Sequence, residues 1–191
     1  MGSDPTFVET RMENLMRLTT LTLALFPMAA IAAGSGSDVA PKPSETTTVC
    51  SDGLVWDLAT QSCMSPEDST NDDSARMNDV RELAYEGYYQ AALDVLDTLE
   101  NPQAPLALTY YGFAHRKAGR VELGMAYYTA ALDTDPNNLL ARSYMGQGHV
   151  ASGDIVLAQA QLTEIRMRGG RDTWAEASLV QALATGVGPS Y

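Results

Sequence analysis

The fold is decided by residues 105–138, which read PLALTYYGFAHRKAGRVELGMAYYTAALDTDPNN. Before Gly119, apolar or small residues recur at the spacing that places them on one face of a helix. These positions are Leu108, Tyr111, Gly112 and His115, and after the glycine the pattern resumes at Val121, Gly124, Tyr128 and Ala131. Pro136 then marks a position that cannot continue a helix. The stretch predicts two amphipathic helices joined by a turn at Gly119, because glycine readily adopts the left-handed conformation such a turn needs.

The same helical pattern occurs three times along the chain. Gly87, Gly119 and Gly153 are separated by 32 and then 34 residues, and a period near 34 indicates an array of helical hairpins. The third unit has the pattern at Arg142, Met145, Gly146 and His149, then at Ile155, Ala158, Leu162 and Ile165, and the first unit retains Gly87, Tyr89, Ala92 and Leu96. Residues 173–176 read as a capping box and predict a last helix through Leu183, with Trp174 packed at the end of the array.

Residues 105–138 resemble the tetratricopeptide repeat at Gly112, Gly119, Val121, Gly124, Tyr128, Ala131 and Pro136. The resemblance implies an all-α domain over residues 74–185. In the family this is a right-handed superhelical array, here of about three helix hairpins, near residues 74–104, 105–138 and 139–172. A C-terminal capping helix at 173–185 would cover the last hairpin, and residues 186–191 would form a tail.

The family resemblance also implies a site, because members bind partner segments in a concave groove lined by the first helix of each hairpin. By position, the groove residues here are Arg81, Tyr85, Thr109, Phe113, Arg116, Lys117, Ser143, Gln147 and Val150. Arg116 and Lys117 beside Phe113 suit a partner segment that carries an acidic group and an apolar anchor. The expected function is a non-catalytic scaffold or adaptor that binds a protein or peptide partner. Three imperfect repeats are near the minimum for stability, which also allows self-association.

The N-terminal part predicts export. Arg11 and Arg17 precede an apolar run from Leu18 to Ile31 that ends in small residues, which is the layout of a secretory signal. We assign residues 1–33 to a signal peptide, with the start at Met12 or Met16 as an alternative. We expect a periplasmic protein with no stable membrane span after cleavage. Residues 34–49 predict a flexible linker, and residues 65–73 predict a solvated acidic linker.

Residues 50–64 predict a small disulfide-linked β-hairpin between these linkers. Cys50 and Cys63 are the chain's two cysteines, and such a pair in an exported chain favours a disulfide. The pattern C-x2-G-x2-W-D-x5-C resembles the hairpin segment of peritrophin-type chitin-binding modules, although that family normally carries six cysteines. Trp56 is therefore either a packing residue or a glycan contact. This keeps open an alternative function as a carbohydrate- or peptidoglycan-associated envelope protein.

Composition and motifs argue against several classes of function. The formal net charge is −12, so the chain does not supply the clustered cations that nucleic-acid binding requires. Phosphate-binding, metalloprotease and nucleophile-elbow motifs are missing, so we expect no catalytic residue and no cofactor. A small enzyme with a site shared between hairpin and helices stays open. His115 and His149 hold the same register in successive repeats, but a helix-packing separation of about 8–10 Å is too long for a shared metal. We expect these histidines to pack and predict no metal site.

Overall fold

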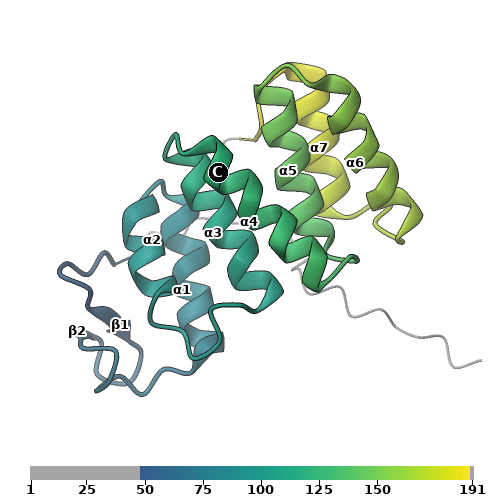
Figure 1. Cartoon of the computed structure of the whole chain (residues 1–191). Helices are drawn as coiled ribbons and strands as arrows, with labels where there is room; N and C mark the ends of the chain where they lie inside the picture. Colours follow the sequence, from purple (N-terminus) through teal and green to yellow (C-terminus); the bar gives the residue numbers. More distant parts are fainter. Residues whose placement is uncertain (1–47, 190–191) are drawn as a thin grey trace, which may run out of the picture. The chain divides into compact units, whose positions relative to one another are not determined.

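A computed structural model describes residues 48–189. Within this range the chain forms two short strands followed by seven helices (Figure 1). The predicted signal peptide, the linker up to residue 47 and the last two residues of the tail lie outside the described residues. None of the helices within residues 48–189 is long and apolar enough to cross a membrane.

The elements follow one another with short connections. The strands are β1 (Val55–Asp57) and β2 (Ser62–Met64). The helices are α1 (Asp73–Tyr85), α2 (Tyr89–Leu96), α3 (Pro105–Lys117), α4 (Val121–Thr134), α5 (Leu139–Ala151), α6 (Ile155–Met167) and α7 (Trp174–Thr185). The predicted mainly helical fold is confirmed, and each of the three marked glycines lies between two helices.

Local chemistry explains where the helices begin and end. The side chains of Asp72, Asn138 and Thr173 accept hydrogen bonds from backbone N–H groups in the first turns of α1, α5 and α7. Such caps satisfy donors that have no partner inside the helix. Gly119 and Gly153 have φ values of +84° and +82°, so the turns predicted there have the left-handed geometry that favours glycine.

The helices pack in sequence-adjacent pairs. α1 packs on α2, α3 on α4 and α5 on α6, while α1, α3, α5 and α7 also contact one another in that order. The first helix of each pair therefore joins a continuous row from α1 to α7. α7 contacts both α5 and α6, so it covers the last pair.

Small residues set the closest approach inside a pair. A Cβ atom added at Gly124 of α4 would lie 2.7 Å from the carbonyl oxygen of Gly112 and 2.8 Å from the backbone nitrogen of Arg116, both in α3. A Cβ added at Gly146 of α5 would lie 2.7 Å from Leu179 of α7. The backbone atoms facing Gly124 leave no room for a side chain there, whereas a side chain at Gly146 would require Leu179 to move.

The interior of the described chain contains two large apolar clusters. The first runs from the hairpin through α5 and includes Val55, Leu96, Phe113 and Tyr144, all fully buried. The second joins α5, α6 and α7 through residues such as Leu162 and Leu179. Trp174, which we expected at the end of the array, packs against the first cluster.

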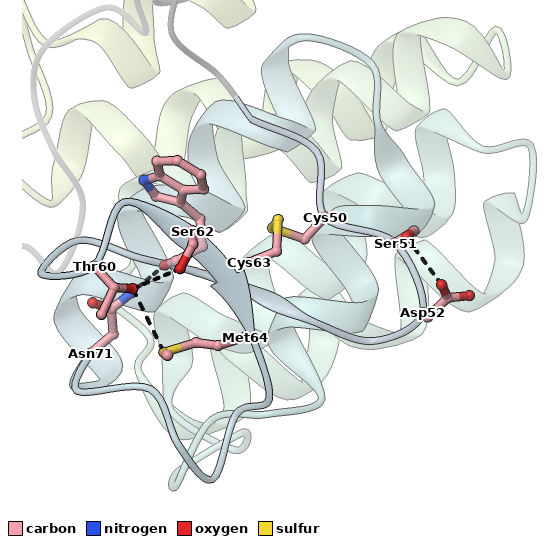
Figure 2. Close-up of a disulfide and its surroundings, with 9 residues drawn as sticks. Cys50, Ser51, Asp52, Thr60, Ser62, Cys63, Met64 and Asn71 are labelled. Carbon is pink, nitrogen blue, oxygen red and sulfur yellow. Dashed lines mark hydrogen bonds between the residues drawn. A yellow bond between two sulfur atoms is a disulfide. The ribbon is translucent and has the colours of Figure 1, made fainter.

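The hairpin and its disulfide are confirmed. β1 and β2 pair antiparallel, and Cys50 is bonded to Cys63 (Figure 2). Val55 on β1 belongs to the main apolar cluster, so the hairpin packs on the helices. The sequence left open whether the hairpin docks on the helical part, and the structure shows that it does.

Residues 65–73, which we predicted to be a solvated acidic linker, hold no helix or strand before Asp73, but several of their polar groups are bonded to the hairpin and to α1. The carboxylate of Asp57 accepts hydrogen bonds from the backbone N–H of Thr70 at 2.8 Å and from the Ser69 hydroxyl at 3.2 Å. Asn71 is buried, and its Nδ2 donates to the carbonyl oxygen of Trp56 at 2.6 Å. Arg76 of α1 donates to the carbonyl oxygen of Pro66 at 2.8 Å. Thr70 and Asn71 of this segment thus bind the hairpin, Pro66 binds α1, and α1 already begins at Asp73.

Candidate functional site

Most of the predicted groove residues lie in the interior. Tyr85, Thr109, Phe113, Ser143, Gln147 and Val150 are all buried, whereas Arg81 and Arg116 are partly exposed and Lys117 is exposed. Side chains in the first set cannot contact a partner while these helices stay packed. The nine groove positions that the family resemblance implied therefore lie on the first helices. Six of the nine side chains, however, are buried and offer no accessible surface to a partner.

One reason is a cluster of aromatic residues between the first helices. The hydroxyl of Tyr85 lies 2.5 Å from that of Tyr144 and 3.0 Å from that of Tyr110. Phe113 is fully buried, with its ring centroid 4.8 Å from that of Tyr144 and 5.5 Å from that of Tyr85. Burial raises the pKa of Tyr85, which keeps its phenol protonated and able to donate. This cluster binds α1, α3 and α5 together.

A second reason is the position of α7 over α5. The hydroxyls of Ser143 and Ser178 lie 2.8 Å apart, and Nε2 of Gln147 lies 3.4 Å from the Ser178 hydroxyl. Val150 belongs to the apolar cluster that includes Leu179 of α7. The polar residues that the sequence placed in an open groove are therefore bonded to the last helix, which fills the groove at the third pair.

Arg116 and Lys117 do lie beside Phe113, as the sequence predicted. The guanidinium carbon of Arg116 is 5.9 Å from the Phe113 ring centroid, and the Lys117 ammonium nitrogen is 5.8 Å from it. Arg116 also donates from Nε to the hydroxyl of Tyr128 at 3.3 Å. Burial, and to a lesser extent the charge of Arg116, lowers the pKa of Lys117. The two cations cover the buried ring, so they interact with it in place of a partner's anchor.

An apolar pocket opens between α1 and α3. The sequence patterns did not indicate this pocket. Its volume is about 360 Å³. Its apolar lining comes from Met77 of α1, Leu106, Ala107 and Tyr110 of α3, and Leu99 of the connection after α2. Polar groups come from Asp73, Ser74, Asn78, Arg81 and Asn101. Met77 and Leu106 are only partly buried, so a side chain of a bound partner can contact them.

A larger and more polar cleft of about 920 Å³ separates the hairpin from α1. The hairpin contributes Trp56, Leu58 and Gln61, and α1 contributes Asn78, Asp79, Arg81 and Glu82. Burial, followed by the negative charge of Glu82, raises the pKa of Asp79 to about 6. The sequence singled out Trp56, but it gave no indication that residues of α1 would line the opposite side of the cleft in which Trp56 lies.

His115 packs against other side chains. The His115 ring stacks on Tyr127 with 5.3 Å between centroids, and its Nδ1 accepts a hydrogen bond from Nε of Arg120 at 2.7 Å. Burial lowers the pKa of both His115 and His149, which favours the neutral imidazole. Over residues 48–189, no group of three or more histidine, cysteine, aspartate or glutamate side chains is arranged to hold a metal ion.

Comparison with known proteins does not add a family. No protein-family model matches the chain, and neither the curated proteins nor the solved structures give a match.

Proposed function

We propose that the protein is a non-catalytic interaction module of the tetratricopeptide-repeat type, which binds a segment of a partner protein. The observation that carries this proposal is the apolar pocket between α1 and α3. In repeat proteins of this kind the first helices form the binding face, and the pocket lies between two of them. Its lining combines apolar side chains with a few polar groups, the composition typical of a binding site.

The pocket suits one apolar side chain of a polypeptide. Met77 is unbranched and flexible, so it can adapt to the shape of an incoming group. Arg81 and Asn78 at the rim can hydrogen-bond to the carbonyl groups of an extended backbone or to a carboxylate. Removal of an apolar side chain from water supplies the free energy, and the polar rim fixes the orientation of the segment.

We further propose that this binding takes place outside the cytoplasm, in the periplasm. The signal-like layout of residues 1–33 supports this location. The bonded pair Cys50 and Cys63 supports it as well, because disulfides persist mainly in oxidising compartments.

The proposal is tested by cross-linking the protein in its native host and purifying it with whatever is bound. We expect a specific protein to be recovered with the wild type and to decrease about tenfold with Met77→Glu, because a carboxylate in the apolar pocket costs roughly 1.4 kcal/mol or more. The matched control is Met167→Glu on α6, where the side chain is 75 % exposed and the same charge should have no effect.

A second variant, Arg81→Glu, changes the rim without altering the apolar wall. It should also reduce recovery while leaving the thermal unfolding curve close to that of the wild type. Equal recovery of the same proteins with the wild type, Met77→Glu and Arg81→Glu would contradict the proposal. If Met77→Glu loses the helical circular dichroism signal, this variant is unfolded, and Arg81→Glu alone then tests the proposal.

A further inference from the structure

The cleft between the hairpin and α1 combines an aromatic ring with carboxylates. Trp56 lies on the hairpin side, and Asp79 and Glu82 lie one turn apart on α1. An indole face and a carboxylate both attract a cation, and the aliphatic part of a long basic side chain can pack on the ring. We propose that this cleft binds a lysine or arginine side chain of the partner segment. This inference rests on the proposed function, since it specifies the partner that the module binds.

Asp79 is the residue whose surroundings most favour a cation. Its Oδ2 atom is buried and accepts no hydrogen bond from the described part of the chain. A buried carboxylate oxygen without a donor is unfavourable when the group is charged, which agrees with the raised pKa of this partly buried residue. A cation held near Asp79 and Glu82 would offset that cost, so binding should be accompanied by release of a proton when the pH is near 6.

The remaining charges are consistent with a basic partner. The described lining of the cleft contains two carboxylates and one guanidinium, that of Arg81. Arg81 also lines the α1–α3 pocket, so it lies at the border between the two sites. The whole chain has a formal net charge of −12, which attracts a basic segment and repels an acidic one before contact.

The two sites also meet. Asn78 and Arg81 line both the hairpin cleft and the α1–α3 pocket, so the sites adjoin along the exposed edge of α1. One extended segment can therefore place an apolar side chain between α1 and α3 and a basic side chain between α1 and the hairpin. The hairpin then contributes directly to recognition, and the disulfide helps to hold its wall of the cleft in place.

The test is a nuclear magnetic resonance titration of the nitrogen-15-labelled protein, as purified from its host, with N-acetyl-arginine amide at pH 7.5. The indole N–H signal of Trp56 serves as the reporter and is assigned from a Trp174→Phe variant, because the chain has two tryptophans. We expect a saturable shift in the millimolar range. N-acetyl-citrulline amide has the same shape without the charge, and it should bind about fivefold more weakly.

The matched variants are Asp79→Asn, which removes one cleft carboxylate, and Glu86→Gln, which removes an exposed one at the end of α1. Asp79→Asn should weaken arginine binding about fivefold, and Glu86→Gln should leave it unchanged. Equal affinity for the citrulline and arginine amides would overturn the proposal. So would a Trp56 shift on addition of an N-acetylglucosamine oligosaccharide with none on addition of arginine amide, which would assign the cleft to a glycan.

One outcome separates this inference from the proposed function. Arginine binding that persists when no partner protein is recovered from the host would contradict the proposed function and leave the cation site in place.

Discussion

Two aspartates at the hairpin illustrate how strongly the surroundings of a single residue decide its chemistry. Asp57 is fully buried, yet its oxygens accept hydrogen bonds from the backbone N–H groups of Ala59, Thr60 and Thr70 and from nearby hydroxyls. The backbone donors of Thr60 and Thr70 hold the pKa of Asp57 well below its ordinary value. Asp79 lies across the hairpin cleft without comparable donors, and its pKa is raised. Asp57 thus joins the hairpin to the segment before α1. The negative charge of Asp79, in contrast, is unfavourable until a ligand or a proton neutralises it.

The raised pKa of Asp79 gives a prediction with a definite sign. The pKa is about 6 in the folded state against 3.8 ordinarily, so the folded protein binds this proton more tightly than the unfolded chain does. The residue therefore destabilises the fold increasingly as the pH rises from about 4 to above 6. Asp79→Asn should raise the free energy of unfolding at pH 8 by about 1 kcal/mol, a value reduced for the partial exposure of the carboxylate.

At pH 4 the advantage of Asp79→Asn should disappear, because the wild-type carboxyl is then protonated. Urea unfolding at both pH values measures the difference, and Asp68→Asn at an exposed site is the matched control. An advantage of the same size at pH 4 and pH 8 would show that the asparagine acts through packing and not through charge.

At the scale of helices, Asn138 joins one pair to the next. It is fully buried at the start of α5, and its Oδ1 accepts the hydrogen bond from the backbone N–H of Ala141 that caps the helix. Its Nδ2 donates to the hydroxyl of Thr109 at 2.9 Å and to the carbonyl oxygen of Pro105 at 3.3 Å, both on α3. The side chain of Asn138 therefore caps the start of α5 and fixes the position of α5 against α3.

Asn138→Ala should consequently cost about 2 kcal/mol, since it removes a helix cap and the hydrogen bond that Asn138 donates to the buried Thr109 hydroxyl. The neighbouring Asn137 is exposed, and Asn137→Ala should change the free energy of unfolding by about 0.5 kcal/mol or less. Urea denaturation of both variants measures the two values. If the two substitutions cost the same, Asn138 does not couple the pairs.

The sequence predicted the helices well because their signals are local. Gly87, Gly119 and Gly153 mark turns whose backbone conformation depends on the glycine itself, and the apolar periodicity marks the buried faces. The groove was predicted less well, because polar residues such as Ser143 and Gln147 look accessible until Ser178 is known to lie against them. The α1–α3 pocket was missed because Leu99 and Asn101 reach it from an irregular connection whose path no periodicity sets. Similarly, the composition of residues 65–72 gave no sign that the carboxylate of Asp57 would hold them.

At the scale of the whole described chain, the hairpin is part of the first apolar cluster and not an appendage. Val55 is fully buried in that cluster, Asp57 holds the segment before α1, and Arg76 of α1 bonds to Pro66 of that segment. The second cluster, between α5 and α7, contains no hairpin residue. Loss of the disulfide should therefore destabilise the first cluster and affect the stability of the second much less.

The variant that tests this arrangement is the double substitution Cys50→Ser, Cys63→Ser. Opening a loop of this size should cost roughly 3 kcal/mol in the chain-entropy model. Because the hairpin packs on α1 and α2, we expect hydrogen exchange to accelerate in those helices as well as in the hairpin, and to accelerate less in α6 and α7. The reduced wild type should behave in the same way, which controls for the serine side chains. Acceleration restricted to residues 50–64 would mean that the hairpin folds independently of the helices, and the cleft beside Trp56 would then lack the fixed wall that the proposed cation site requires.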